Sequence, residues 1–116
     1  MTAGELAEAF SRHDFAAVYP HLAEDVRWDI VGDREIAGQA AVIAACEESA
    51  AYLRGVTTTF LAFRTTVGDG AVVVDSTARY AGEDGVSTVA SCDVFAFRDA
   101  RVAEIRSFTV ELDGAS

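Results

Sequence analysis

The apolar residues near the start and in the middle of the chain recur at helical spacing. Leu6 lies three residues before Ala9 and four before Phe10, so these residues share one face of a helix. The run QAAVIAACEESAAYL, residues 39–53, consists mainly of strong helix formers, and Gly55 follows it as a helix stop. The pattern therefore predicts one helix near the N-terminus and a longer helix in the middle of the chain.

A further helix is predicted between these two. Asp14 is a suitable cap for its first turn, and Phe15, Val18 and Leu22 then lie on one side. Pro20 falls inside this pattern, where its ring and its missing N–H end or bend a helix. We therefore expect a second helix that is short or bent.

The segment EDVRWDIVG, residues 24–32, has the alternating pattern of a half-buried strand. Val26, Trp28 and Ile30 point to one face, and charged residues between them point to the other. Gly32 closes the strand, and the short piece EIAG that follows is expected to be extended. This strand separates the predicted helices at the N-terminus from the long helix.

Three or four more strands are expected in the second half of the chain, where Val, Thr and Phe are frequent. The turns GDG, AGEDG and RDAR separate them, and strands joined by such short turns pair antiparallel. Helices followed by an antiparallel meander make an α+β domain. We predict a cone-shaped, curved antiparallel sheet, covered by three N-terminal helices that enclose a pocket against it. The strands are expected at residues 56–67, 71–80, 86–97 and 102–112.

The length and the charge of the chain narrow the possible partners. The 116 residues suit a single domain spanning residues 1–116, with a folded core at about 5–112. Hydrophobic residues make up 51% of the chain, enough for a sizeable core. The net charge is -10, from 19 acidic and 9 basic side chains. Since nucleic acids and anionic membranes attract basic surfaces, we expect neither as a partner.

The N-terminus and the cysteines indicate a cytoplasmic protein. The first residues, MTAGELAEAF, lack the basic region and apolar stretch of a signal peptide, and no apolar run is long enough to span a bilayer. Cys46 and Cys92 have no metal-ligand spacing and are expected to be reduced. The last four residues, DGAS, are expected to form a frayed tail.

Asp93 is the most informative candidate residue, because it interrupts the otherwise apolar strand VASCDVFAF, residues 89–97. A buried carboxylate is costly unless it is protonated, paired or in contact with water. In one interpretation, Asp93 lies at the pocket floor with a raised pKa and donates a hydrogen bond to a ligand carbonyl or phenolate. In the other, a neighbouring hydroxyl or arginine holds it as a structural carboxylate. The candidates for that partner are Ser107, Thr109, Arg79 and Arg106.

The remaining polar residues give weaker signals. We expect His13 to be exposed and His21 to be a solvated group at a helix end. No cluster of histidines and acids has metal-ligand spacing, so we predict no metal and no cofactor. Cys46, among alanines on the apolar side of the long helix, is expected to be a buried thiol. Cys92 alternates with Asp93 and therefore faces the opposite side of the sheet.

The order of these elements resembles a known superfamily. Two helices, then LAEDVRWDIVGD and IAGQAAV, then a helix and a meander ending in CDVFAFRDARVAEIRSF, are similar to the nuclear transport factor 2-like superfamily. The SnoaL-like branch, with polyketide cyclases and relatives of ketosteroid isomerase, is the most similar. The resemblance covers about residues 5–112 and implies the cone-shaped fold and a homodimer through the sheet. It does not select one activity, because the fold hosts isomerases, cyclases, dehydratases, epoxide hydrolases and non-catalytic binders.

Only one functional residue of the isomerase has a counterpart of the same type in this sequence. Matching CDVFAF to the isomerase pattern places Asp93 on the aspartic acid of the oxyanion hole, an acid that an apolar site keeps neutral. The basic aspartate falls on or beside Ile30, the oxyanion tyrosine near Leu6 and its supporting tyrosine near Cys46. Steroid-type isomerisation is therefore not expected. The Asp-Arg-Asp arrangement of the epoxide hydrolases is not matched at its spacing either.

We predict that the pocket binds a small apolar or aromatic molecule, with Asp93 as its polar anchor. An alternative is a cofactor-independent, non-redox enzyme of the isomerase, cyclase or dehydratase type, in which Asp93 is the catalytic acid or hydrogen-bond donor to an enolate. No base for such a reaction is evident. A further alternative is a non-catalytic dimerisation module. The residues expected to line the pocket are Phe10, Trp28, Ile30, Cys46, Ala50, Phe95, Ile105 and Ser107.

Overall fold

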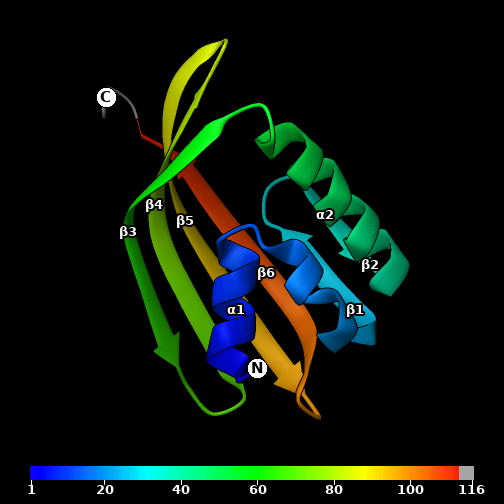
Figure 1. Cartoon of the computed structure of the whole chain (residues 1–116). Helices are drawn as coiled ribbons and strands as arrows, with labels where there is room; N and C mark the ends of the chain where they lie inside the picture. Colours follow the sequence, from blue (N-terminus) through cyan, green and yellow to red (C-terminus); the bar gives the residue numbers. More distant parts are fainter. Residues whose placement is uncertain (113–116) are drawn as a thin grey trace.

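The computed structural model describes residues 1–112 as a curved six-stranded sheet with its helical segments on one face (Figure 1). The predicted α+β class is therefore confirmed, and the expected tail, residues 113–116, lies outside the described residues. The elements are α1 (Ala3–Ser11), the 3-10 turns η1 (Phe15–Ala17) and η2 (Tyr19–His21), β1 (Leu22–Ile30), β2 (Arg34–Ala37), α2 (Gln39–Leu53), β3 (Thr57–Val67), β4 (Ala71–Gly82), β5 (Gly85–Arg98) and β6 (Arg101–Glu111).

The strands are ordered β2-β1-β6-β5-β4-β3 across the sheet. Strands β3 to β6 form the antiparallel meander expected from their short turns. Strand β1 pairs antiparallel with β2 and parallel with β6. The sheet is therefore mostly antiparallel, and one parallel pair joins its early and late halves.

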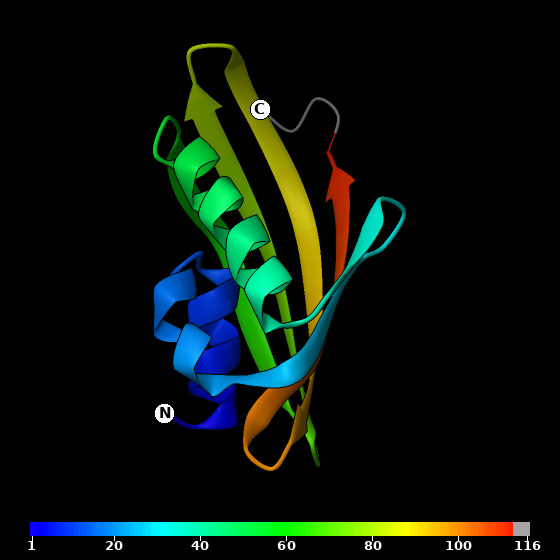
Figure 2. The same ribbon diagram turned by 90° about the vertical axis from the view of Figure 1, so that its right-hand side faces the viewer.

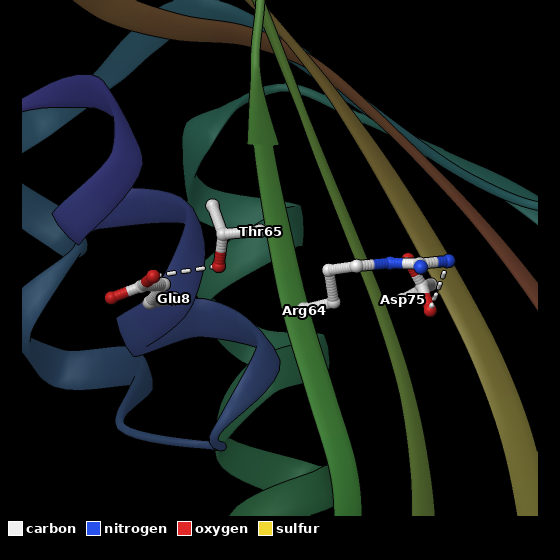
Figure 3. Close-up of polar contacts among 4 residues, drawn as sticks. All are labelled: Glu8, Arg64, Thr65 and Asp75. Carbon is white, nitrogen blue, oxygen red and sulfur yellow. Dashed lines mark hydrogen bonds and ion pairs between the residues drawn. The ribbon is translucent and has the colours of Figure 1, made fainter.

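The two faces of the sheet have different environments, as β3 illustrates (Figure 3). The hydroxyl of Thr65 donates a hydrogen bond to Glu8 of α1 over 2.6 Å, on the face that the helices cover. The neighbouring Arg64 points the other way and pairs with Asp75 of β4, with 3.0 Å between Nε and Oδ2. We call the face toward the helices the inner face and the opposite one the outer face.

Figure 2 shows the helical segments on one side of the sheet. The buried side chains of the core lie between these segments and the sheet. The ring of Phe10 on α1 is at the centre of the core. It meets Phe15, Trp28 and Phe95 edge-on, with ring centroids 5.2, 5.1 and 5.6 Å away. Such aromatic pairs contribute about 0.5–1.5 kcal/mol each beyond the burial of their area. Phe10 thus joins α1 to η1, β1 and β5.

Helix α1 has well-defined ends. The hydroxyl of Thr2 accepts from the N–H of Glu5 over 3.1 Å, and the Glu5 carboxylate accepts from the N–H of Thr2 over 2.8 Å. This reciprocal pair is a capping box, which satisfies two backbone donors at the helix start. Beyond the helix end, His13 adopts a φ of 72°, in the left-handed region that non-glycine residues seldom occupy.

The prediction of a second α-helix was wrong in its type. Two 3-10 turns occupy this segment, Asp14 makes no side-chain capping bond, and Leu22 already begins β1. The cause is Pro20, which lacks an N–H and clashes with the preceding turn of an α-helix. Phe15 and Val18 are nevertheless buried, as their spacing predicted. No helix within residues 1–112 has the length and apolar character needed to cross a bilayer.

Candidate functional site

An open cavity of about 610 Å³ lies between the inner face and the helical segments. Its wall is formed by α1, η1, α2 and the strands β1, β3, β4, β5 and β6. Apolar and aromatic side chains make up much of the wall, with a smaller set of polar groups among them. This size and composition are typical of small-molecule sites, which span about 300–1,000 Å³.

Several of the expected site residues come together in this cavity. Phe10 reaches it from α1, Trp28 and Ile30 from β1, Asp93 from β5 and Ser107 from β6. The parallel pairing of β1 with β6 places Ile30 directly opposite Ser107, and the antiparallel pairing of β5 with β6 places Asp93 opposite Ser107. The strands therefore position Ile30, Ser107 and Asp93 in one row across the sheet.

Four of the expected residues do not line the cavity. Cys46, Phe95 and Ile105 are fully buried in the core, and Ala50 packs partly buried against it. Phe95 and Ile105 are opposite each other on the inner face, but further toward the β5–β6 turn, where Phe10 covers Phe95. The alternating pattern predicts which face of a strand a side chain occupies. It does not predict which positions along that face border the cavity. Burial also raises the pKa of the Cys46 thiol to about 12, so this thiol is not activated.

The carboxylate of Asp93 is held by two serine hydroxyls. Ser11 Oγ donates to Oδ2 over 2.8 Å, and Ser107 Oγ donates to Oδ1 over 2.7 Å. Trp28 Nε1 in turn donates to Ser107 Oγ over 2.9 Å. Because an indole N–H is only a donor, Ser107 accepts from Trp28 and keeps its own proton for Asp93. Trp28, Ser107 and Asp93 therefore form a directed chain of hydrogen bonds.

The partners of Asp93 agree only in part with those considered from the sequence. Ser107 was among the candidates, and Ser11 was not. Arg106 lies on the outer face instead, with its Nε 3.7 Å from Asp29 Oδ2. None of the ion pairs among residues 1–112 involves Asp93.

Burial is the main electrostatic influence on Asp93. It raises the pKa of the carboxyl above its ordinary value, and the two serine hydrogen bonds and the charge of His13 lower it again in part. A raised pKa was expected in the interpretation of Asp93 as a pocket residue, and a hydroxyl partner was expected in its interpretation as a structural carboxylate; Asp93 has both features. A carboxyl of this kind can accept or release a proton closer to neutral pH than an exposed one.

The prediction that His13 is exposed was wrong. It is partly buried and lines the cavity beside aromatic rings of Phe15, Phe60 and Tyr80, whose centroids are 5.8, 5.7 and 6.1 Å from its own. Burial lowers the pKa of His13, and the negative charge of Asp93 raises it in part. The cavity thus contains two titratable groups that interact. His13 has a left-handed backbone, and its ring lies beside Phe60 of β3 and Tyr80 of β4. No local sequence pattern indicates this position.

Two other polar features complete the site. Tyr80 lines the cavity from β4, and burial together with the charge of Asp93 raises the pKa of its hydroxyl. Residues 1–112 contain no group of three or more His, Cys, Asp or Glu side chains that could hold a metal ion. The polar side chains of this cavity, Asp93, His13 and Tyr80, are groups that can exchange hydrogen bonds and protons.

Comparison with known proteins identifies the fold and the family. The family model for the SnoaL-like domain matches residues 3–105. A nuclear transport factor 2-like protein of unknown function from Cytophaga hutchinsonii is 26% identical with a TM-score of 0.82, over 91% of this chain and 94% of that chain. No curated protein matches the sequence.

Two further solved structures share the fold at lower identity. A proposed polyketide cyclase from Pseudomonas putida is 20% identical with a TM-score of 0.72, over 93% of this chain and 91% of that chain. An LEH-like epoxide hydrolase from M. tuberculosis is 21% identical with a TM-score of 0.69, over 93% of this chain and 82% of that chain. At these identities the likeness extends to the fold alone. Because the family model spans nearly the whole of the described sheet and its helices, this chain belongs to the SnoaL-like domain family.

Proposed function

We propose that the cavity binds a small, mainly apolar or aromatic molecule, and that Asp93 anchors a polar group of this ligand. The observation that carries the proposal is a desolvated carboxyl at the wall of an open cavity. Each of its oxygens accepts one serine hydrogen bond, and a carboxylate oxygen has room for a second. Phe10, Trp28 and Ile30 supply apolar surface for the body of the ligand.

The proposal can be tested with 2-naphthol, an aromatic probe with one hydroxyl group. Trp28 is the only tryptophan in the chain, so its fluorescence reports directly on the cavity. We expect saturable quenching, and we expect Asp93→Ala to weaken binding by roughly tenfold, because a hydrogen bond to a charged group is lost.

The matched control is Asp75→Ala, which removes a carboxylate from the outer face of the neighbouring strand. Affinity should be unchanged in this variant. Equal affinity in the wild type and in Asp93→Ala would show that Asp93 is not the anchor.

A second candidate function is proton-transfer catalysis without a redox cofactor, and His13 is the observation that favours it. No base to act with Asp93 is evident from the sequence. His13 can take this role, because it lines the same cavity as Asp93. Its left-handed backbone is a further argument, since strained conformations cluster at functional sites. In such a reaction an imidazole nitrogen takes a proton from the carbon next to a ligand carbonyl, and the electron pair moves to the carbonyl oxygen as an enolate.

The enzyme candidate predicts hydrogen exchange in a simple ketone. Incubation with 2-tetralone in D2O, followed by proton NMR, measures the loss of the protons beside its carbonyl. We expect the wild type to exchange them at least about 100-fold faster than His13→Gly, as for removal of a general base. Glycine adopts a positive φ without strain, so the backbone is preserved. His21→Gly is the control outside the cavity; equal rates in the wild type and His13→Gly leave binding alone as the function.

We infer that the chain forms a homodimer through the outer face of the sheet, as the family resemblance implies. Phe108 and Val110 of β6 are 37% and 61% exposed, and Phe108 lies directly opposite Cys92 on β5. Apolar side chains grouped on one face are typical of an interaction surface. A dimerisation module without a ligand would need no cavity, so the cavity favours the binding function over that alternative.

We also propose a cytoplasmic location for the protein and a small molecule as its ligand. Cys46 and Cys92 are both free thiols, which supports a reducing, cytoplasmic location. The net charge of -10 supports a small-molecule ligand over a nucleic acid or an anionic membrane surface.

A further inference from the structure

We propose that Tyr52 is a side-chain lid of the cavity, and that its ring moves from solvent onto the bound molecule and slows its release. The inference rests on the proposed binding function and adds a residue that controls how long a ligand stays bound. It is carried by the position of Tyr52 at the cavity opening, by the freedom of its side chain and by the fixed backbone beneath it.

Tyr52 lies where the cavity meets water. It belongs to α2 and lines the cavity, yet it is 71% exposed. Phe10 and Trp28 line the same cavity and are buried. A lining residue that is mostly in solvent marks the opening of a cavity, and buried lining residues mark its depth. The Tyr52 ring is therefore at the entrance, beyond the rings that form the inner wall.

Tyr80 approaches Tyr52 from the sheet side of the cavity. It lines the cavity from β4 and is partly buried. Burial raises the pKa of the Tyr80 hydroxyl, and the charges of Asp93 and Tyr52 raise it further, so the two phenol groups are close enough to interact. Helix α2 and strand β4 thus face each other at the opening. A Tyr52 ring that turns toward β4 covers the space between them.

The side chain of Tyr52 is free to turn. Among residues 1–112 it makes no side-chain hydrogen bond, no aromatic pair and no cation–π contact. Tyr19 differs, because its hydroxyl donates to Glu47 of α2 over 2.8 Å. An exposed side chain without such a tether changes its rotamer within picoseconds to nanoseconds.

The backbone beneath Tyr52 is held on both sides. The first half of α2 is anchored in the core by three buried residues, Val42, Ala45 and Cys46. Beyond the helix, Val56 packs so closely against Gly82 of β4 that a Cβ at Gly82 would lie 2.9 Å from Val56 Cγ1. The end of α2 is therefore fixed relative to the sheet, and rotation of the Tyr52 side chain is the movement that remains.

Filling the cavity gives the ring a reason to close. In the free protein the ring is surrounded mainly by water. An aromatic molecule in the cavity presents apolar surface at the opening, and covering it removes apolar area of both partners from water. Edge or offset contacts between the two rings add to this attraction. Because the contact exists only in the bound state, it slows dissociation and leaves association nearly unchanged.

Stopped-flow measurement of Trp28 fluorescence with 2-naphthol tests the lid on the intact chain. Tyr52→Ala should release the naphthol about tenfold faster, the effect of losing one partly buried aromatic contact. Its association rate should stay near that of the wild type. Tyr52→Phe keeps the ring and should release the naphthol at the wild-type rate. Leu61→Ala is the matched control, since Leu61 is an exposed apolar residue of β3 outside the set of described residues that line the cavity.

A second measurement follows the ring in the wild type. With 13C-labelled tyrosine, Tyr52→Phe assigns the Tyr52 ring signals, and a neutral gadolinium chelate broadens signals that are open to solvent. This broadening should be largely lost when 2-naphthol saturates the cavity. Equal release rates in the wild type and Tyr52→Ala, or a ring that stays exposed with naphthol bound, overturn the lid and leave Asp93-dependent binding intact. Absence of saturable binding by the wild type overturns the proposed function itself.

Discussion

At Asp93, burial and hydrogen bonding act in opposite directions on one side chain. Along β5, the inner-face positions on either side of it are Ser91 and the fully buried Phe95. Its carboxyl loses solvation and gains two hydroxyl donors, and the loss dominates, since its pKa is raised. The folded protein therefore holds the proton of Asp93 more tightly than the unfolded chain does.

This imbalance predicts how stability depends on pH. Because the folded-state pKa of Asp93 lies above 3.8, the folded state binds more protons than the unfolded state just above that pH, and this contribution to stability is lost as the pH rises through the folded-state pKa. Asp93→Asn should therefore have a larger free energy of unfolding than the wild type at neutral pH, and the difference should shrink toward about pH 4. Urea unfolding at a series of pH values measures it.

His13 acts with the opposite sign in the same experiment. Burial lowers its pKa, so its contribution is present above its ordinary value of 6.5 and is lost as the pH falls through the lowered value. Both the wild type and Asp93→Asn contain His13, so most of its contribution cancels when the two proteins are compared at the same pH. Asp75→Asn, on the outer face, is the control for loss of a carboxylate. A wild type that is more stable than Asp93→Asn at neutral pH contradicts the prediction.

The outer face of β6 leaves an aromatic side chain, Phe108, partly exposed to water. The Arg106 guanidinium lies over the Phe108 ring, 5.2 Å from its centroid, and still leaves the ring 37% exposed. A partner sheet would cover this surface and remove the apolar area from water.

The dimer proposal predicts the effect of a charge at this position. Phe108→Glu should weaken self-association by roughly 100-fold, since an interface anchor is replaced by a charge that must be desolvated. Size-exclusion chromatography with light scattering should then show a dimer for the wild type and a monomer for the variant. Val67→Glu, at the exposed end of the edge strand β3, is the control and should remain dimeric. A wild type that is monomeric at every concentration disproves the dimer.

For the whole molecule, the parallel pairing of β1 with β6 decides where the site lies. It brings Trp28 to Ser107, which are far apart in the sequence, and so completes the chain of hydrogen bonds to Asp93. The strong local patterns predicted both strands but not their adjacency. Short turns specify neighbours only within the meander, and β1 is separated from β6 by β2, α2 and three strands.

The sequence by itself determined the α+β class, the presence of α1, the extent of α2 and the strands of the meander. These features follow from periodicity and turn residues, which act over a few neighbouring positions. Only the tertiary structure decided which inner-face residues border the cavity. It buried Phe95 and Ile105, gave Ser11 to Asp93 and turned His13 toward the sheet. The reason is physical: depth and contact depend on how separate elements pack, and no single segment contains that information.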